Sequence, residues 1–237
     1  MTSQRNKIVL LGAIAAGAAL LVGGAWALHV GPFGAAGRGS VLATVDGEPI
    51  YLSDARYRAM GLAAVHGGPT GSLDEGWQER VLQSLVDDLV IQAEAERRGL
   101  IASDQEVAAQ ILDLRELFPS LAEYEAWLGS QQMDEDELER RVRLQTTAVR
   151  VYEAVTADVE VSEGEIRNYY EEHPQEFLGA DGSPVPFSAV RDSIAESLME
   201  EEKNGAYAAW LDARRRAATL VIVMDDWWRS MQDEQQS

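Results

Sequence analysis

The chain contains no cysteine among its 237 residues. Disulfide bonds, thiolate nucleophiles, cysteine-ligated zinc and iron–sulfur clusters are therefore excluded, and so is a lipid anchor on an N-terminal cysteine. Packing and polar contacts alone must hold the fold together. Because a cysteine-free chain is compatible with oxidising and reducing surroundings alike, this absence does not locate the protein.

Histidine is scarce as well, and the chain has only His29, His66 and His173. None of them has a second histidine one helical turn away, the spacing that zinc-binding helices use, so we expect no metal site and no cofactor. The Gly-x-Ser-x-Gly sequence that carries the nucleophile of many hydrolases is also missing. The sequence therefore predicts no catalytic residue of these kinds.

Basic residues are outnumbered, with 20 Lys and Arg against 40 Asp and Glu and a net charge of -20. Such a charge repels the phosphates of nucleic acids, so no nucleic-acid partner is expected, and an acidic, solubilising surface explains it. The adjacent residues Asp87 and Asp88 point about 100° apart on a helix and do not converge on one atom. We interpret them as a solvated helix edge.

One long stretch lacks charge altogether. Residues 8–30 contain no Asp, Glu, Lys or Arg, and roughly 20 apolar residues suffice for a helix to span a bilayer. Basic residues precede it, so residues 1–7 are expected in the cytoplasm and the rest of the chain outside, in a periplasm or the extracellular medium. We predict a single transmembrane signal anchor at 8–30 and a flexible linker at 31–40. Cleavage after Ala25-Trp26-Ala27 is the alternative.

The strongest helical pattern after the linker runs from Trp77 to Leu100. Its apolar residues form two adjacent stripes at helical spacing, namely Trp77, Val81, Leu85 and Leu89 beside Leu82, Val86 and Val90. A Ser-x-x-Glu capping box at Ser72 precedes this helix, and Gly99 ends it. Other helices must cover so broad an apolar surface, so we assign it to the core.

The rest of the chain predicts a mainly α fold. Capping boxes at Ser103, Ser120 and Ser162 indicate further helix starts, and the last helix is expected at Phe187–Ala217. Short strands are predicted before and after these helices, around an Asp46-Gly47 turn and at Thr219–Met224, and we expect the N- and C-terminal strands to pair as two strands.

The helical domain is assigned to residues 41–224 and a polar tail to residues 225–237. Within that tail, the role of Trp227 and Trp228 stays open between client contact, anchoring at the membrane interface and packing on the last helix.

These elements, in this order, resemble the N-terminal chaperone module of SurA- and PrsA-type foldases. The resemblance rests on the sequences VDGEPI at 45–50, VLQSLVDDLVIQAEAERRGL at 81–100, SDQEV at 103–107, FPSLAEYEAWL at 118–128, EDELERRVR at 135–143 and VSEGEIRNYY at 161–170. The segment from Phe187 to Met224 resembles the C-terminal piece that completes the module. The resemblance implies a multi-helix domain similar to the SurA N-terminal domain, and it covers residues 41–224.

The chain departs from the family in one respect. Foldases of this family usually carry a parvulin-type prolyl isomerase domain before the last helix, and a small domain needs on the order of 100 residues. Only LGADGSPVP separates Phe177 from Phe187. We therefore expect a chaperone module without an isomerase domain, and hence no enzyme.

Four apolar side chains in a short segment between two long helices are candidates for client binding. They are Phe118, Tyr124, Trp127 and Met133. Aromatic and methionine side chains offer large contact area without sequence-specific hydrogen bonds, which suits unfolded chains. The same residues would also serve to close the helical core, and the sequence leaves both roles open.

The resemblance and the apolar segment together predict a membrane-anchored, extracytoplasmic chaperone without isomerase activity. Its partners are expected to be unfolded or newly exported polypeptides, and the N-terminal helix is expected to contact the membrane. A peptidyl-prolyl cis-trans isomerase, as in the parvulin-containing relatives, is one alternative. A dedicated assembly factor or scaffold for a single partner protein is another.

Overall fold

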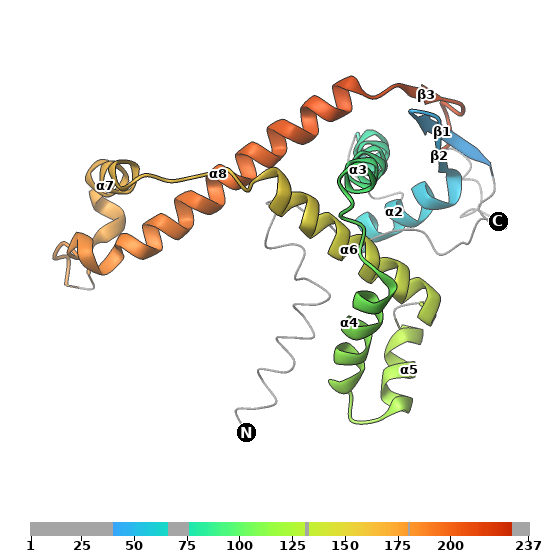
Figure 1. Ribbon diagram of the computed structural model, residues 1–237, viewed down its shortest axis with the longest axis horizontal. Coiled ribbons are helices and arrows are strands. Elements are labelled where there is room, and N and C mark those ends of the chain that lie inside the picture. The colour runs from blue at the N-terminus through green and yellow to red at the C-terminus, as the bar shows by residue number, and fades with distance from the viewer. Residues whose placement is uncertain (1–39, 66–75, 131–132, 180, 229–237) are drawn as a thin grey trace. The chain divides into compact units, whose positions relative to one another are not determined.

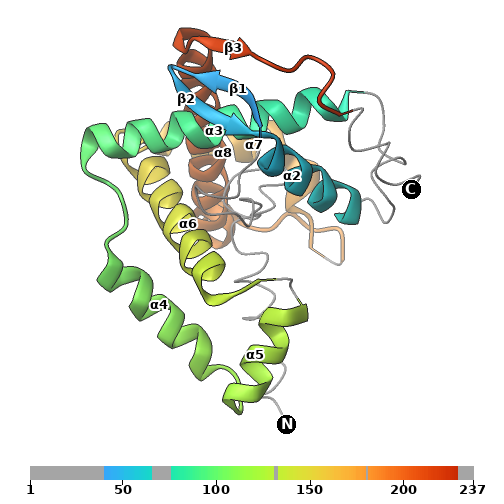
Figure 2. The same cartoon turned by 90° about the vertical axis from the view of Figure 1, so that its right-hand side faces the viewer.

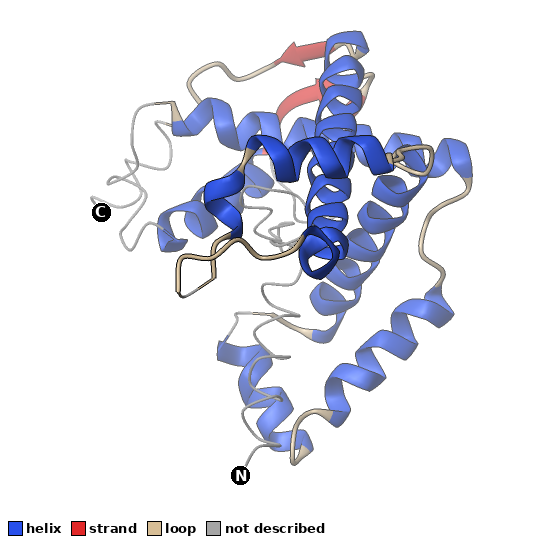
Figure 3. Ribbon diagram, turned by 90° about the vertical axis from the view of Figure 1, so that its left-hand side faces the viewer, coloured by secondary structure: helices blue, strands red, loops and turns tan. Residues whose placement is uncertain are grey.

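A computed structural model describes residues 40–65, 76–130, 133–179 and 181–228, which are mainly helical (Figure 3). The elements are β1 (Val41–Val45), β2 (Glu48–Tyr51), α2 (Leu52–Val65), α3 (Trp77–Arg98), α4 (Asp104–Glu116), α5 (Leu121–Ser130), α6 (Glu135–Val155), α7 (Glu163–Glu172), the 3-10 helix η2 (Pro174–Phe177), α8 (Phe187–Ala217) and β3 (Leu220–Ile222). The predicted mainly α class is confirmed.

The chain divides into two compact units. The first contains the described parts of residues 1–151 and 211–237, and the second consists of residues 152–210. Helix α8 therefore contributes its last residues, from Leu211, to the first unit. Within the first unit, the sheet lies beside α2 and α3, while α4 and α5 lie away from it (Figures 1 and 2).

The sheet has three strands in the order β2-β1-β3. The expected pairing of the N- and C-terminal strands is confirmed, since β1 and β3 are antiparallel with Thr44 opposite Val221. The prediction of only two strands was incomplete. Asp46 and Gly47 have φ angles of 51° and 91°. Positive φ angles at two successive residues form a tight hairpin turn, which places β2 directly beside β1 as a third strand.

Helix α3 buries the stripe that its sequence predicts, including Trp77, Val81 and Leu85. Gly99, at a φ of 68°, ends the helix and donates its N–H to the carbonyls of the last turn, as predicted. At the other end, the residue before the helix is Gly76 in the left-handed region. The capping box predicted at Ser72 lies outside the described residues.

Capping boxes do fix two other helix starts. The Ser103 hydroxyl accepts from the Glu106 N–H at 3.4 Å while the Glu106 carboxylate accepts from the Ser103 N–H at 2.9 Å. Ser162 and Glu165 repeat the arrangement at 3.3 and 2.7 Å. Each box satisfies two N–H groups that have no partner inside the helix, so the starts of α4 and α7 are set locally.

Asp87 and Asp88 of α3 are not a solvated edge, and that prediction was wrong. Asp87 is only 7% exposed and pairs with Arg215 at the end of α8, while Asp88 pairs with Arg58 of α2. Burial raises the pKa of Asp87 to about 6, and Arg215 beside it acts to lower it. Arg58 of α2 and Arg215 of α8 pair with the two carboxylates, so these two helices cover a side of α3 that we expected to face solvent.

A third carboxylate of α3 completes this arrangement. Glu94 is 4% exposed and pairs with Arg97 and Arg98 of its own helix at 2.6 Å and with Arg214 of α8 at 3.3 Å. Hydrogen bonds from Arg97 are the main reason that the pKa of Glu94 is lowered. Arg214 and Arg215 at the end of α8 therefore bind this helix to α3.

The predicted anchor at residues 8–30 lies outside the described residues, as does the linker before Ser40. Among the helices that the structure describes, none combines the length and the apolar character needed to cross a bilayer. The membrane anchor stays a prediction.

Candidate functional site

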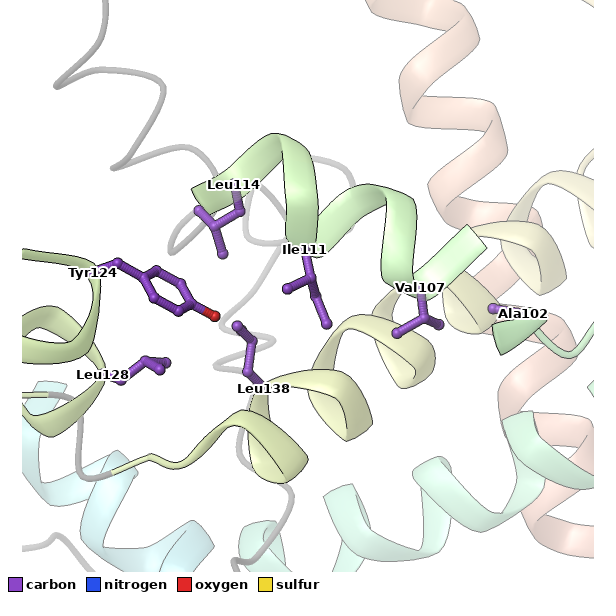
Figure 4. Close-up of a cluster of buried hydrophobic side chains, with 7 residues drawn as sticks. All are labelled: Ala102, Val107, Ile111, Leu114, Tyr124, Leu128 and Leu138. Carbon is purple, nitrogen blue, oxygen red and sulfur yellow. The ribbon is translucent and has the colours of Figure 1, made fainter. Parts of the chain in front are cut away.

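Helices α4 and α5, with the start of α6, enclose a buried apolar cluster. The buried positions of α4 recur at helical spacing, and the cluster as a whole contains Ala102, Val107, Ile111, Leu114, Tyr124, Leu128 and Leu138 (Figure 4). Polar contacts fasten the start of α4 to α6, because Arg143 donates to the Ala102 carbonyl at 2.8 Å and Thr147 accepts from the Ala102 N–H at 3.1 Å. We call this group of residues the α4–α5 cluster.

All four side chains predicted for client binding meet at this cluster, but in two roles. Tyr124 is 1% exposed and belongs to the cluster itself, whereas Phe118, Trp127 and Met133 are half-buried and pack against it. The rings lie close together, with centroids 5.6 Å apart for Phe118 and Tyr124 and 5.4 Å apart for Phe118 and Trp127. The buried Tyr124 ring thus belongs to the core on which the other three side chains pack.

This arrangement offers an adaptable apolar surface. The half-buried rings present part of their area to solvent, and Leu121, at the start of α5, is 49% exposed beside them in sequence. Large apolar contacts of this kind gain binding energy from area without selecting a sequence. The role of these residues in client binding stays a prediction.

The second unit contains an aromatic group that sequence reasoning missed. Tyr169, Tyr170, His173, Phe177 and Phe187 form it, and we call it the ring cluster. Tyr169 stacks on His173 at 4.2 Å, and the Tyr170 ring lies 5.1 Å from Phe177 and 5.4 Å from Phe187. All five are half-buried. The signal in the sequence that could have indicated this cluster is the spacing of Tyr169, His173 and Phe177 at four-residue steps.

Polar contacts fix the ring cluster. The Tyr169 hydroxyl donates to Glu176 at 3.0 Å, the Tyr170 hydroxyl donates to the Val185 carbonyl at 2.8 Å, and a His173 ring nitrogen lies 2.9 Å from the Tyr169 carbonyl oxygen. The hydrogen bond to Glu176 is the main cause of a raised pKa of Tyr169. Both hydroxyls are engaged, so the rings present mainly apolar surface.

The chain after Phe177 folds back onto this group. Val185 donates its N–H to the Phe177 carbonyl at 2.8 Å, and Gly179 donates to the Ser183 carbonyl at 2.8 Å. Arg167 lies over the Phe187 ring, 4.6 Å from its centre. In the part of the chain that the structure describes, no group of three metal-ligating side chains comes together. The ring cluster itself offers apolar contact and hydrogen bonding.

Comparison with known proteins assigns the first unit. The profile of the SurA-like N-terminal domain matches residues 2–152, more than half of the chain. This chain belongs to the SurA-like N-terminal domain family. A second profile, that of the PPIC-type PPIase (peptidyl-prolyl isomerase) domain, matches residues 161–226. Those residues form α7, η2, α8 and β3, and they include the whole ring cluster.

Individual known proteins are similar to the chain as well. The chain is 24% identical over 183 residues to the foldase protein PrsA from two strains of Clostridium perfringens, an overlap of 71% of this chain and 51% of PrsA. It thus spans about half the length of the curated relatives that it matches. A solved structure from work on PEB4 and the periplasmic protein Cj1289, SurA-like chaperones of Campylobacter jejuni, has a TM-score of 0.55 at 10% identity and covers 78% of this chain and 99% of that chain.

The prediction that the parvulin domain is missing was wrong. We expected an insert between Phe177 and Phe187, but the isomerase profile begins at Val161 and continues through α8 to Asp226. It therefore overlaps the elements that we had assigned to the chaperone module. The expectation that the chain is not an enzyme is overturned by the same match. The homology to SurA- and PrsA-like chaperones is confirmed, and the isomerase alternative fits these findings better than a chaperone without one.

Trp227 packs on the core helix α3, a role that was not among the three considered from the sequence. It is 4% exposed and its ring meets Trp77 of α3 edge to face, with centroids 5.7 Å apart. The contact closes the apolar stripe of α3 at its N-terminal end. Packing on the core helix therefore accounts for this residue.

Proposed function

We propose that the protein is a foldase-type chaperone that holds unfolded polypeptides at the α4–α5 cluster and catalyses prolyl cis-trans isomerisation through residues 161–226. The observation that carries the isomerase part is the coincidence of the isomerase profile with the ring cluster. The SurA-like domain and the half-buried rings beside Tyr124 support the holding part.

The ring cluster suits the chemistry of an X-Pro bond. Rotation about a peptide bond must lose resonance between the nitrogen and the carbonyl, at a barrier of roughly 18–20 kcal/mol. Water favours the charge-separated resonance form, so a prolyl ring packed against Tyr170, Phe177 and Phe187 would lose part of that stabilisation. No cofactor and no covalent step is required.

Replacing Phe177 with alanine is expected to lower kcat/KM for isomerisation by roughly three- to tenfold, because an aromatic contact contributes roughly 0.5–1.5 kcal/mol. The measurement is a protease-free fluorescence assay on a tetrapeptide with one X-Pro bond. Phe118→Ala, in the other unit, is the matched control and should leave the rate unchanged. A wild-type chain that does not accelerate the reaction at all would overturn the isomerase part.

Replacing Trp127 with alanine is expected to weaken binding of an unfolded client about fivefold or more, since a central aromatic contact commonly contributes more than 1 kcal/mol to an interface. The assay is suppression of aggregation of a reduced, denatured client at graded chaperone concentrations. Leu112→Ala, which removes an apolar residue 57% exposed on α4, is the control. Equal losses in both variants would show that any exposed apolar residue serves.

We also propose that the protein acts outside the cytoplasm, held by the segment at 8–30. The support is the uncharged run and the basic residues before it. Digestion of intact spheroplasts tests this proposal. A body that resists protease until the membrane is broken would contradict it.

A further inference from the structure

Strand β3 forms one edge of the sheet and leaves its apolar side chains uncovered. On its inner side it pairs with β1, and in the described part of the chain no segment pairs with its outer side. Leu220, Val221, Ile222 and Val223 are 43%, 52%, 45% and 62% exposed. Successive strand residues point to opposite faces, so both faces of β3 are open to solvent here.

The register shows which backbone groups face outward. Asp46 donates its N–H to the Thr219 carbonyl at 3.0 Å, and Val223 donates to the Leu42 carbonyl at 2.9 Å. Hydrogen-bonded and non-hydrogen-bonded positions alternate in an antiparallel ladder, so the groups of Val221 also face β1. The N–H and C=O groups of Leu220 and Ile222 therefore point away from the sheet.

Protein edges of this kind are usually protected. Charged side chains, proline or a bulge on an edge strand prevent it from pairing with other chains. The sequence Thr219–Met224 contains neither charge nor proline, and its residues are strong strand formers. The strand is thus built to accept a further strand by main-chain hydrogen bonding.

A second copy of this chain is a poor occupant. Each copy carries a net charge of -20, and two short β3 strands side by side would bury far less than the roughly 1,200 Å² of a stable interface. An unfolded client requires only a transient contact. Main-chain pairing reads no sequence, which is what a binder of many unfolded chains requires, and the acidic charge favours segments with basic residues.

We propose that the outer edge of β3 binds extended, apolar segments of client polypeptides that carry basic residues, by adding the client as a fourth strand beside Leu220 and Ile222. The inference rests on the proposed chaperone function and adds a second contact to it. The α4–α5 cluster binds side chains, whereas the β3 edge binds the main chain.

Residue-resolved hydrogen exchange on the full chain tests the pairing directly. The probe is the synthetic peptide Lys-Val-Thr-Val-Thr-Val-Lys, and the control is the same peptide with an N-methyl group on every residue after the first, which removes the donors from both of its edges. The amide of Ile222 is expected to exchange about tenfold or more slowly with the probe and unchanged with the control. The amide of Val223, already bonded to Leu42, should respond to neither.

Variants of the edge complete the test. Ile222→Lys places a cation on the strand and should abolish protection by the probe, while Val223→Thr keeps shape and charge and should retain it. Protection that survives Ile222→Lys, or an unprotected Ile222 at saturating probe, overturns the proposal. So does sedimentation that shows a dimer lost in Ile222→Lys, because the edge is then occupied by a second copy.

The aggregation assay separates this inference from the proposed function. A chain that suppresses aggregation equally as wild type and as Ile222→Lys remains a chaperone but does not use the β3 edge. A wild-type chain that leaves aggregation unchanged contradicts the proposed function itself.

Discussion

Arg215→Ala is expected to lower the free energy of unfolding by about 3–5 kcal/mol, because it leaves the buried carboxylate of Asp87 without its partner. Both side chains are largely withdrawn from solvent, since the side chain of Arg215 is 24% exposed and that of Asp87 is 10% exposed. Arg215 also approaches the second carboxylate oxygen at 3.5 Å. Urea unfolding at pH 7 measures the change.

The pH dependence of this variant carries a specific signature. An acid whose pKa is higher in the folded than in the unfolded chain binds its proton more tightly when folded, so its contribution to stability grows as pH falls between the two values. For Asp87 this range runs from about 6 down to 3.8. Without Arg215 the upper limit moves higher, since its lowering effect is lost. The deficit of Arg215→Ala should therefore shrink between pH 7 and pH 5.

The neighbouring arginine is the matched control. Arg216 pairs with Asp212 at 2.8 Å on the surface, where it is 74% exposed, and exposed pairs contribute about 1 kcal/mol or less. Arg216→Ala should change stability by no more than that, with no change in its pH dependence. If the two variants lose the same small amount, the pair of Arg215 and Asp87 does not fasten α8 to α3.

Two substitutions of Tyr124 are expected to change the free energy of unfolding in opposite directions. Tyr124→Ala removes a ring that is 1% exposed and should lower the free energy of unfolding by about 3–5 kcal/mol. The hydroxyl, however, is buried among Ile111 and Leu138 (Figure 4) and has no hydrogen-bond partner in the described part of the chain. Tyr124→Phe removes that unsatisfied hydroxyl group and should raise the free energy of unfolding by up to about 1–3 kcal/mol.

Thermal and urea unfolding measure both variants, with Leu112→Ala on the exposed side of α4 expected to stay within about 0.5 kcal/mol of wild type. A loss of stability in Tyr124→Phe would mean that the hydroxyl has a partner. Client binding by Tyr124→Phe should equal that of wild type, since the surface rings rest on the same support.

Local signals in the sequence predicted most of the helices. The bounds Phe187–Ala217 follow from apolar spacing, and the boxes at Ser103 and Ser162 are complete within four residues each. The sheet was only partly predictable. Pairing of the terminal strands follows from their need for hydrogen bonds, whereas the length of β2 depends on the turn at Asp46 and on β1 beside it.

The errors have a common physical origin in distant contacts. Asp87 was read as a surface residue because its partner Arg215 lies 128 positions later in the sequence, and no local pattern connects them. The ring cluster was missed for a related reason. Phe187 returns to Tyr170 only because the intervening loop folds back, and no local pattern in the sequence predicts that. Of the four residues predicted to bind clients, only the structure shows that Tyr124 is buried.

The central position of β1 has a consequence for how the protein is made. One neighbour, β2, follows immediately, but Thr219, the residue before β3, is 173 positions from its hydrogen-bond partner Asp46. At roughly 5–20 residues per second, the ribosome needs on the order of ten seconds or more to reach it. Throughout that time β1 has an open edge, and closing so long a loop is slow. The first unit is thus completed last, when its C-terminal strand has been synthesised.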